Sequence, residues 1–206
     1  MPGQVDCLVL AAGGSRRMGQ PKLLMEVGEH GTILEIVLLS HLASSVRRIC
    51  AVTAGWLEGF DDIVSRYGSE RLEFIKIAGP CPMSESLKTG WRWLEAETKP
   101  DGVMISLADK PLVTADTVNL MVRAFRESGK RICVPVHAGE WGHPVVIAST
   151  FGDEIMRLTS DQGAREVLLR HKDEIEEVKI NSDEVLVDVD RLSDMDIIRS
   201  RFGAHE

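Results

Sequence analysis

Residues 6–24 read DCLVLAAGGSRRMGQPKLL, an apolar run followed at once by a loop rich in glycine and in cationic side chains. The run 6–12 is aliphatic, as is typical of a strand covered on both faces of a parallel sheet. Two familiar phosphate-binding patterns do not fit the loop. Ser15 stands where the fingerprint G-x-G-x-x-G needs its second glycine, and Gln20 and Pro21 stand where the P-loop needs lysine and serine or threonine.

Strand and helix patterns alternate through the following hundred or so residues. The first helix pattern opens with Thr32 and has Glu35 three positions later, which is the capping-box signature of a helix start. Further strands are expected at 47–54, 72–78 and 102–108, and further helices at 57–68, 84–97 and 114–128. This alternation predicts a mostly parallel sheet with helices on both faces, a three-layer α/β/α arrangement of the Rossmann-like kind.

The regular alternation ends after residue 130. Residues 131–149, RICVPVHAGEWGHPVVIAS, contain two apolar runs joined by a glycine-containing turn and predict a β-hairpin. Beyond them, helices are expected near 150–158, 162–171 and 193–202, and short strands at 176–180 and 185–189. We therefore expect one α/β domain over residues 1–206, with an antiparallel elaboration in its C-terminal half.

The composition is that of a soluble globular protein, with 44% hydrophobic and 27% charged residues. A net charge of -8 argues against a broad nucleic-acid surface, whereas Arg16, Arg17 and Lys22 in the glycine loop suit a small anion. No apolar run is long enough for a membrane span, and no signal-peptide pattern is present. The four cysteines form no C-x-x-C pair, so we expect free thiols in a cytoplasmic protein.

The glycine loop is the first candidate site. Gly13 and Gly14 let the backbone approach a ligand closely, and consecutive N–H groups in such a loop can point at phosphate oxygens. Ligands of open α/β sheets bind outside the carboxyl ends of the strands, where this loop is expected to lie. The competing interpretation is an ordinary turn with solvated basic side chains.

Carboxylates follow two of the predicted strands. Asp109, in SLADKPLV (106–113), comes directly after a buried strand, and Asp188 and Asp190 alternate along the predicted strand at 185–189 and just after it. Asp109 and Asp190 could hold Mg²⁺, because carboxylate oxygens are the ligands this ion prefers. The alternative is a capping role, which is the favoured interpretation for Asp194 in the first turn of the last helix.

Two further segments carry candidate binding residues. In GPCPMSESLKTG (79–90), a loop leads into a helix that is expected to start at Ser84, where backbone amides and hydroxyls could contact a base or an anion. Helix capping by Ser84 alone is the simpler explanation. His143, in WGHPVV, is either a ligand-binding residue or a structural histidine of the hairpin.

Together these segments resemble one family. LAAGGSRRMGQPK is similar to the signature L-A-A-G-x-S-x-R-M-G-x-x-K of the molybdenum-cofactor nucleotidyltransferases, and the resemblance continues in MSESLKTG, LADKPLV, GHPVVI, SDQGAR and VDVDRLSDM. The GHPVV and DQGAR pair favours the cytidylyltransferase branch. Lys110 departs from the pattern, since glutamine or methionine is commoner there, and Arg191 and Leu192 replace Thr-Pro.

The resemblance implies a nucleotidyltransferase fold and a Mg²⁺-dependent transfer of a nucleoside monophosphate from an NTP to a phosphorylated acceptor, with release of pyrophosphate. Residues 1–128 would form the nucleotide-binding half and 129–206 the acceptor-binding half. The implied catalytic residues are Arg17 and Lys22, the metal ligands Asp109 and Asp190, the acceptor-binding residue His143, and the nucleotide-binding residues Leu10, Ala11, Ala12, Gly13, Gly14, Ser15, Gly79, Ser84 and Ser86.

The resemblance also suggests substrates and partners. CTP is favoured as the nucleotide, with GTP as the alternative, and molybdopterin is the expected acceptor. A molybdoenzyme or its maturation chaperone is the possible protein partner. Two alternatives stay open at this point: transfer to another acceptor such as a sugar phosphate, and a non-catalytic nucleotide-binding protein of cofactor maturation. The reaction requires no general base, because an acceptor phosphate is already ionised at neutral pH.

Overall fold

A computed structural model describes residues 3–13, 21–55, 59–79 and 81–203. Within these ranges, eight strands form one sheet in the order β3-β2-β1-β4-β7-β5-β6, and β8 pairs with β5. The strands are β1 (Val5–Ala11), β2 (Ile49–Ala54), β3 (Leu72–Ile77), β4 (Gly102–Leu107), β5 (Ile132–His137), β6 (Glu140–Trp141), β7 (Val145–Ala148) and β8 (Ile175–Lys179). The first four strands are parallel, and β7 runs antiparallel to both β4 and β5, which confirms the predicted mixed sheet.

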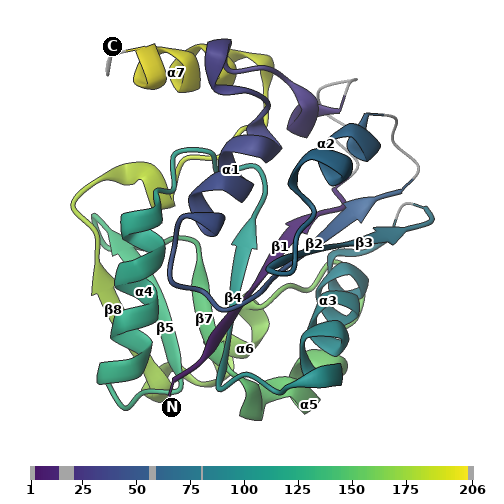
Figure 1. Cartoon of the computed structure of the whole chain (residues 1–206). Helices are drawn as coiled ribbons and strands as arrows, with labels where there is room; N and C mark the ends of the chain where they lie inside the picture. The colour runs from purple at the N-terminus through teal and green to yellow at the C-terminus, as the bar shows by residue number, and fades with distance from the viewer. Residues whose placement is uncertain (1–2, 14–20, 56–58, 80, 204–206) are drawn as a thin grey trace.

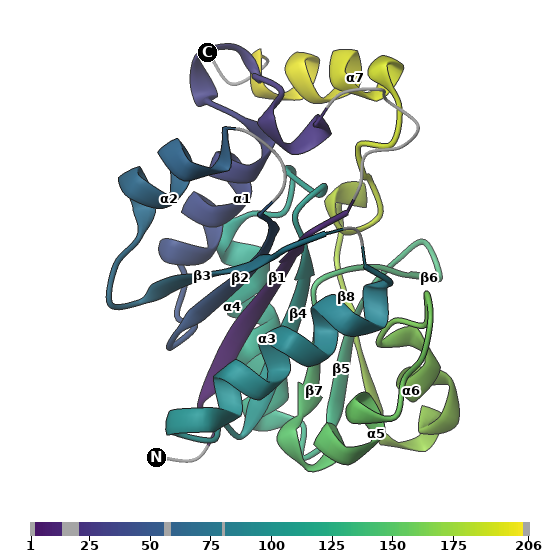
Figure 2. The same ribbon diagram turned by 90° about the vertical axis from the view of Figure 1, so that its right-hand side faces the viewer.

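Helices cover both faces of the sheet (Figures 1 and 2). They are α1 (Ile33–Leu42), α2 (Phe60–Tyr67), α3 (Met83–Glu97), α4 (Ala115–Glu127), α5 (Gly152–Met156), α6 (Arg165–Arg170) and α7 (Leu192–Gly203). Helices α1, α2 and α4 pack on one face, and α3, α5 and α6 on the other. Helix α7 lies beyond the carboxyl ends of the central strands (Figure 2).

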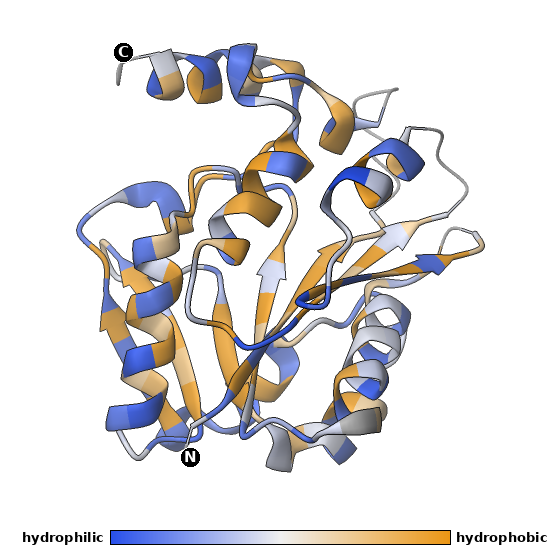
Figure 3. Ribbon diagram, viewed as in Figure 1, coloured by the Kyte–Doolittle hydropathy of each residue, from blue (hydrophilic) through white to orange (hydrophobic). Residues whose placement is uncertain are grey.

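Each face of the sheet has its own apolar core, because side chains along a strand point alternately to opposite faces. In β1, Cys7 and Val9 belong to the core under α1 and α4, whereas Leu8 belongs to the core under α3. Trp91 of α3 is fully buried in that second core. Figure 3 shows apolar strands between helices that carry their polar residues outward. The apolar runs of the sequence thus form the central layer that positions every loop at the sheet's ends.

The helix starts agree with the sequence at α1 and differ at α3. Thr32 and Glu35 form the predicted capping box of α1. Helix α3, by contrast, begins at Met83 without a side-chain cap, and Ser84 donates its hydroxyl to Ser160 O at 2.7 Å. The prediction that Ser84 caps this helix is wrong, because Ser84 lies inside the first turn and faces a loop from the C-terminal half.

The predicted antiparallel elaboration is present, but the short strand β6 (Glu140–Trp141) was not expected, and one expected strand is missing. The two apolar runs at 131–149 pair through β5 and β7, and β7 also pairs with β4. The expected strand at 185–189 is not formed. Leu186 N and Val187 N both donate to Asp183 O, in a turn that follows the 3-10 helix Asp183–Val185, so these donors are not available to a ladder. Asp188 and Asp190 therefore follow a turn rather than lying on a strand.

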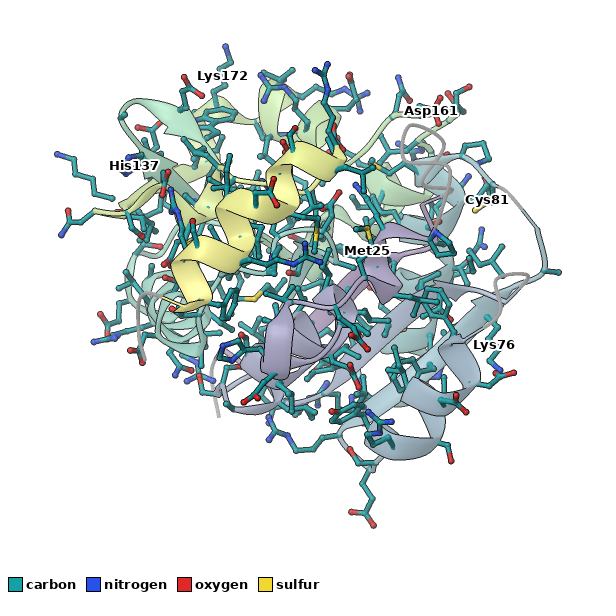
Figure 4. All side chains as sticks on the ribbon, turned by 90° about the horizontal axis from the view of Figure 1, so that it is seen from above. Met25, Lys76, Cys81, His137, Asp161 and Lys172 are labelled. Carbon is teal, nitrogen blue, oxygen red and sulfur yellow. The ribbon has the colours of Figure 1, made fainter. Side chains whose placement is uncertain are left out.

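The C-terminal helix packs on the segment that follows the glycine loop. Arg199 Nη2 of α7 donates to Glu26 O at 3.0 Å, and the rings of His30 and Phe202 lie 5.0 Å apart. Figure 4 views this end of the molecule from above, with Met25 near its centre and with Cys81 and Asp161 together on one side. None of the helices in the described ranges has the length and apolarity needed to span a membrane.

A buried ion cluster at the opposite end of the sheet yields a stability prediction. The Asp6 carboxylate is fully buried and accepts hydrogen bonds from Arg47 and Arg48 at 2.7 and 2.8 Å. Asp6→Ala takes away the fully buried carboxylate that both guanidinium groups share, so it is expected to lower the free energy of unfolding by about 3–5 kcal/mol in urea titrations. The exposed Asp62→Ala is the control, with an expected loss of about 0.5 kcal/mol or less. Equal losses would contradict a special role for the cluster.

Candidate active site

Three of the predicted site residues meet at the carboxyl ends of the strands. Lys22 begins a short 3-10 helix after the glycine loop, Asp109 lies two residues beyond β4, and Asp190 precedes α7. The Lys22 Nζ atom is 2.8 Å from Asp109 Oδ2 and 3.2 Å from Asp190 Oδ1, and it donates to Val189 O at 2.6 Å. Segments far apart in the sequence thus converge on one ammonium group.

This geometry meets the condition for a shared metal ion. Two oxygens that each lie within 3.2 Å of the same nitrogen are far closer than the roughly 10 Å beyond which one hydrated ion could not bridge them. Asp109 Oδ1 is buried and has no hydrogen-bond donor among the described residues. An unpartnered, buried carboxylate oxygen beside a second carboxylate fits an oxygen-liganded ion such as Mg²⁺.

The protein ligands of such an ion would be few. No group of three or more histidine, cysteine, aspartate or glutamate side chains is arranged to hold a metal in the described part of the chain. Mg²⁺ commonly takes only one or two carboxylates and fills its other positions with water and phosphate oxygens. The pair Asp109 and Asp190 therefore suits an ion that is completed by a phosphorylated substrate.

The charges of Lys22, Asp109 and Asp190 interact strongly with one another. Burial by itself would lower the pKa of Lys22, but the charges and hydrogen bonds of Asp109, and then of Asp190, outweigh it, and the pKa of Lys22 is raised. The Lys22 side chain is only 13% exposed, so it has little access to water. Lys22 is consequently a fully charged cation at neutral pH, as a phosphate ligand must be.

Asp194 holds the backbone that carries Asp190. Its Oδ2 atom accepts from Asp190 N at 2.8 Å and from Arg191 N at 2.7 Å, and these two bonds lower the pKa of Asp194. The predicted helix-start role of Asp194 is therefore confirmed. The same contacts also place the Asp190 carboxylate near Lys22.

Sequence reasoning missed the part that Lys110 plays at this edge. Its ammonium group is buried, with 5% of the residue exposed, and Nζ donates to Leu186 O at 2.8 Å. Burial lowers the pKa of Lys110, although Asp188 and then Asp109 act against this change. Burial also disfavours the charged form of Asp188, so the pKa of this carboxyl is raised although the charge of Lys110 acts against the change. The unusual lysine in LADKPLV was the one sign in the sequence that this position has a special role. In the structure Lys110 contacts the segment 186–188 through Leu186 O and the charge of Asp188.

His143 lies at the same edge, just before β7. Its backbone N–H donates to Val185 O at 3.0 Å, and its Nδ1 is 3.4 Å from Ile105 O. Burial lowers the pKa of His143 to about 4, so the imidazole is neutral at neutral pH. A neutral imidazole can contact a polar group of an acceptor, and acceptor binding by His143 stays a prediction.

The buried imidazole should make stability depend on pH. The pKa of His143 falls from its ordinary 6.5 to about 4 on folding, so between these values the unfolded chain binds a proton that the folded chain does not. This residue's contribution therefore lowers stability as the pH falls from 6.5. Urea titrations give the free energy of unfolding at pH 7 and at pH 5. On going from pH 7 to pH 5, this free energy should fall by about 2 kcal/mol more in the wild type than in His143→Gln. Equal losses in the two proteins would contradict the shifted pKa.

The predicted nucleotide-binding residues lie around this edge, with part of the glycine loop outside the described ranges. Gly14, Ser15 and Arg17 lie outside the described residues, and Leu10, Ala11 and Ala12 form and follow the end of β1. A Cβ added at Gly13 or Gly79 would meet no atom of the described residues within 4 Å, so these residues leave the backbone open to a ligand at both positions.

The two serines of the 79–90 segment are buried. The Ser84 hydroxyl is already engaged with Ser160 O, and the Ser86 Oγ lies 3.2 Å from Cys81 Sγ. Ser84 thus joins the first turn of α3 to the loop that contains Ser160. Binding of a nucleotide by Ser84 and Ser86 stays a prediction.

An apolar pocket lies elsewhere on the molecule. It has a volume of about 570 Å³ and is lined by one side of α1, the turn 111–115 and the end of α7. None of the predicted site residues lines it. The polar edge described above, rather than this apolar pocket, has the charged groups that phosphate chemistry requires.

The chain is similar to known proteins over most of its length. The chain is 25% identical over 198 residues to the molybdenum cofactor cytidylyltransferase of Escherichia coli K12, covering 96% of this chain and 97% of that protein. It is 30% identical over 165 residues to the purine catabolism protein PucB of Bacillus subtilis 168, covering 77% and 78%. Both alignments cover most of this chain and most of each relative.

The fold is shared with solved structures. The crystal structure of Rv0371C from Mycobacterium tuberculosis H37Rv in complex with manganese superposes with a TM-score of 0.77 at 21% identity, covering 96% of this chain and 98% of that one. The family model of the MobA-like NTP transferase domain matches residues 7–175. This chain therefore belongs to the family of MobA-like NTP transferase domains.

Proposed function

We propose that this nucleotidyltransferase transfers CMP from CTP to the phosphate of molybdopterin and releases pyrophosphate. Membership of the family makes the chain an NTP-dependent nucleotidyltransferase. The observation that carries the proposal is the meeting of Lys22, Asp109 and Asp190 at the carboxyl ends of β1 and β4. The choice of CTP and molybdopterin is supported by the nearly full-length similarity to the Escherichia coli cytidylyltransferase.

Each half of the chain has a separate task in this reaction. The loop after β1 would hold the triphosphate with its backbone N–H groups, with Arg17 and Lys22 offsetting the phosphate charge. The 79–86 segment would contact the base, since Gly79 leaves space beside its backbone. Residues 129–206 would bind the acceptor, with His143 at the edge that faces β4.

The transfer itself needs positioning and charge stabilisation rather than covalent help from the protein. The acceptor phosphate attacks the α-phosphorus of CTP, a new P–O bond forms, and the bond to pyrophosphate breaks. A Mg²⁺ ion held by Asp109 and Asp190 would supply positive charge to the phosphate oxygens. Lys22 would donate hydrogen bonds to oxygens on which negative charge increases. His143 is neutral and is not required as a base, because the attacking phosphate is already ionised.

The cellular setting follows from the proposed product. A cytosine dinucleotide of molybdopterin would pass in the cytoplasm to a molybdoenzyme or to its maturation chaperone. A sugar phosphate is the alternative acceptor. A non-catalytic accessory role is the alternative from another class, but Lys22, Asp109 and Asp190 are all retained and in contact, which favours catalysis.

A pyrophosphate-release assay tests the proposal. With Mg²⁺ and molybdopterin present, CTP is expected to be used at least about tenfold faster than GTP, because a site that hydrogen-bonds one base rejects a base that leaves its buried groups unpaired. Preference for GTP would overturn the cytidylyl assignment alone. Release only with a sugar phosphate would replace molybdopterin as the acceptor, and binding of CTP without release under any condition would favour the accessory role.

A further inference from the structure

The position of Lys22 has a consequence for the order in which ligands enter. Among its contacts with the described residues are three oxygens, namely Asp109 Oδ2 at 2.8 Å, Asp190 Oδ1 at 3.2 Å and the carbonyl of Val189 at 2.6 Å. Carboxylate and carbonyl oxygens are also the donors that a divalent cation uses. The lysine therefore occupies the place between the two carboxylates where a shared ion would have to bind.

An ion and this ammonium group cannot share the position. Two cations at contact distance repel strongly, and the limited exposure of the Lys22 side chain, 13%, leaves little water to screen them. The Asp109 side chain is also only 23% exposed. For a metal ion to bind between Asp109 Oδ2 and Asp190 Oδ1, the Lys22 ammonium must first leave these two oxygens, and it then needs other acceptors.

Phosphate oxygens are the acceptors that the neighbouring loop would bring. Lys22 begins the 3-10 helix Lys22–Leu24, directly after the glycine loop, and its side chain reaches from there to the carboxylates. A triphosphate held by the loop would lie within the range of the same side chain. The anionic oxygens of a phosphate accept hydrogen bonds from an ammonium group as well as carboxylate oxygens do.

We propose that Lys22 closes the metal site of the free protein by bridging Asp109 and Asp190, and that nucleotide opens it by drawing the ammonium onto its phosphates. The metal then binds together with the nucleotide rather than before it. This inference rests on the proposed function, because it assigns the two carboxylates to a metal and the loop to a triphosphate. It adds an ordered, lysine-controlled entry of the ion.

Lys110 offers a matched control. Its ammonium is buried in the same cluster and interacts with the charges of Asp188, Asp109 and Asp190, but it donates to Leu186 O instead of bridging the carboxylates. Removing either lysine removes one positive charge near the metal ligands. Only removal of Lys22 vacates the position between them.

The test is a titration of each protein with Mn²⁺ in the absence of nucleotide, followed by electron paramagnetic resonance of the free ion. Lys22→Met is expected to bind one Mn²⁺ about a hundredfold more tightly than the wild type, because the ion no longer has to displace charge-assisted hydrogen bonds. Lys110→Met should gain about fivefold at most. In the wild type, adding a non-hydrolysable CTP analogue should raise water-proton relaxation enhancement, which reports protein-held Mn²⁺.

Other outcomes overturn the inference. Tight nucleotide-independent binding by the wild type, an equal gain in Lys110→Met, or no gain in a folded Lys22→Met would each do so. Thermal unfolding monitors folding, and Lys22→Gln serves if the methionine variant unfolds. The titration needs no acceptor and no turnover. A failure of pyrophosphate release would therefore count against the proposed function, while the Mn²⁺ titration alone decides whether Lys22 closes the carboxylate pair.

Discussion

Replacing Lys22 with alanine is expected to lower turnover about a hundredfold or more while the protein stays folded. A positive charge placed where negative charge develops in a transition state commonly contributes several kcal/mol, and each tenfold change in rate corresponds to about 1.4 kcal/mol. Lys22 is charged, its side chain is only 13% exposed, and it is positioned by contacts to Asp109 and to the segment Val189–Asp190. The measurement is the initial rate of pyrophosphate release at saturating CTP and Mg²⁺.

A matched variant controls for the loss of a lysine as such. Lys130→Ala removes an exposed ammonium that donates to Asp173 O at 2.7 Å, near the start of β5 and thus at the other end of the sheet. Its turnover should stay within about twofold of the wild type, since surface changes away from a site have small effects. Near-normal turnover in a folded Lys22→Ala protein would remove Lys22 from the mechanism.

The sequence allowed the fold and the place of the site to be predicted wherever the signals were local. The apolar run before the glycine loop became β1, and the Thr32 and Glu35 capping box starts α1 as predicted. The meeting of Asp109 with Lys22 was also predictable, because residues that follow parallel neighbouring strands emerge at one edge of a sheet. In each case the pattern reports a property of a few consecutive residues.

What the sequence did not reveal depends on contacts between distant segments. Residues 185–189 have the apolar alternation of a strand, but the turn that follows Asp183 takes up their first backbone donors. Ser84 has the right residue type for a helix cap, but Ser160, 76 positions away, accepts its hydroxyl. The partner of Lys110, Leu186 O, is also invisible to local pattern, because it is a backbone atom of an irregular segment.

The largest loss of activity is expected when either of the two proposed metal ligands, Asp109 or Asp190, is replaced by its amide. Asp109→Asn and Asp190→Asn should each lower Mg²⁺-dependent turnover about a thousandfold, because a neutral amide holds a divalent cation poorly and the ion chiefly stabilises charge that develops during transfer. The affinity for CTP should fall by less than about tenfold, since in the proposed function the glycine loop would supply most contacts to the phosphates. Rates and CTP affinities are measured by pyrophosphate release and by calorimetry.

The two variants should also differ from each other in a defined way. Asp109 is 23% exposed and has the buried, unpartnered Oδ1, whereas Asp190 is 42% exposed. Water can therefore replace the lost ligand more easily at position 190, and raising the Mg²⁺ concentration should restore more turnover to Asp190→Asn than to Asp109→Asn. Asp153→Asn, at an exposed position in the first turn of α5, is the control and should be neutral. If both site variants kept turnover within about tenfold of the wild type, the carboxylates would not share the catalytic ion, and the close approach of Asp109 and Asp190 would reflect their ion pairs with Lys22 alone.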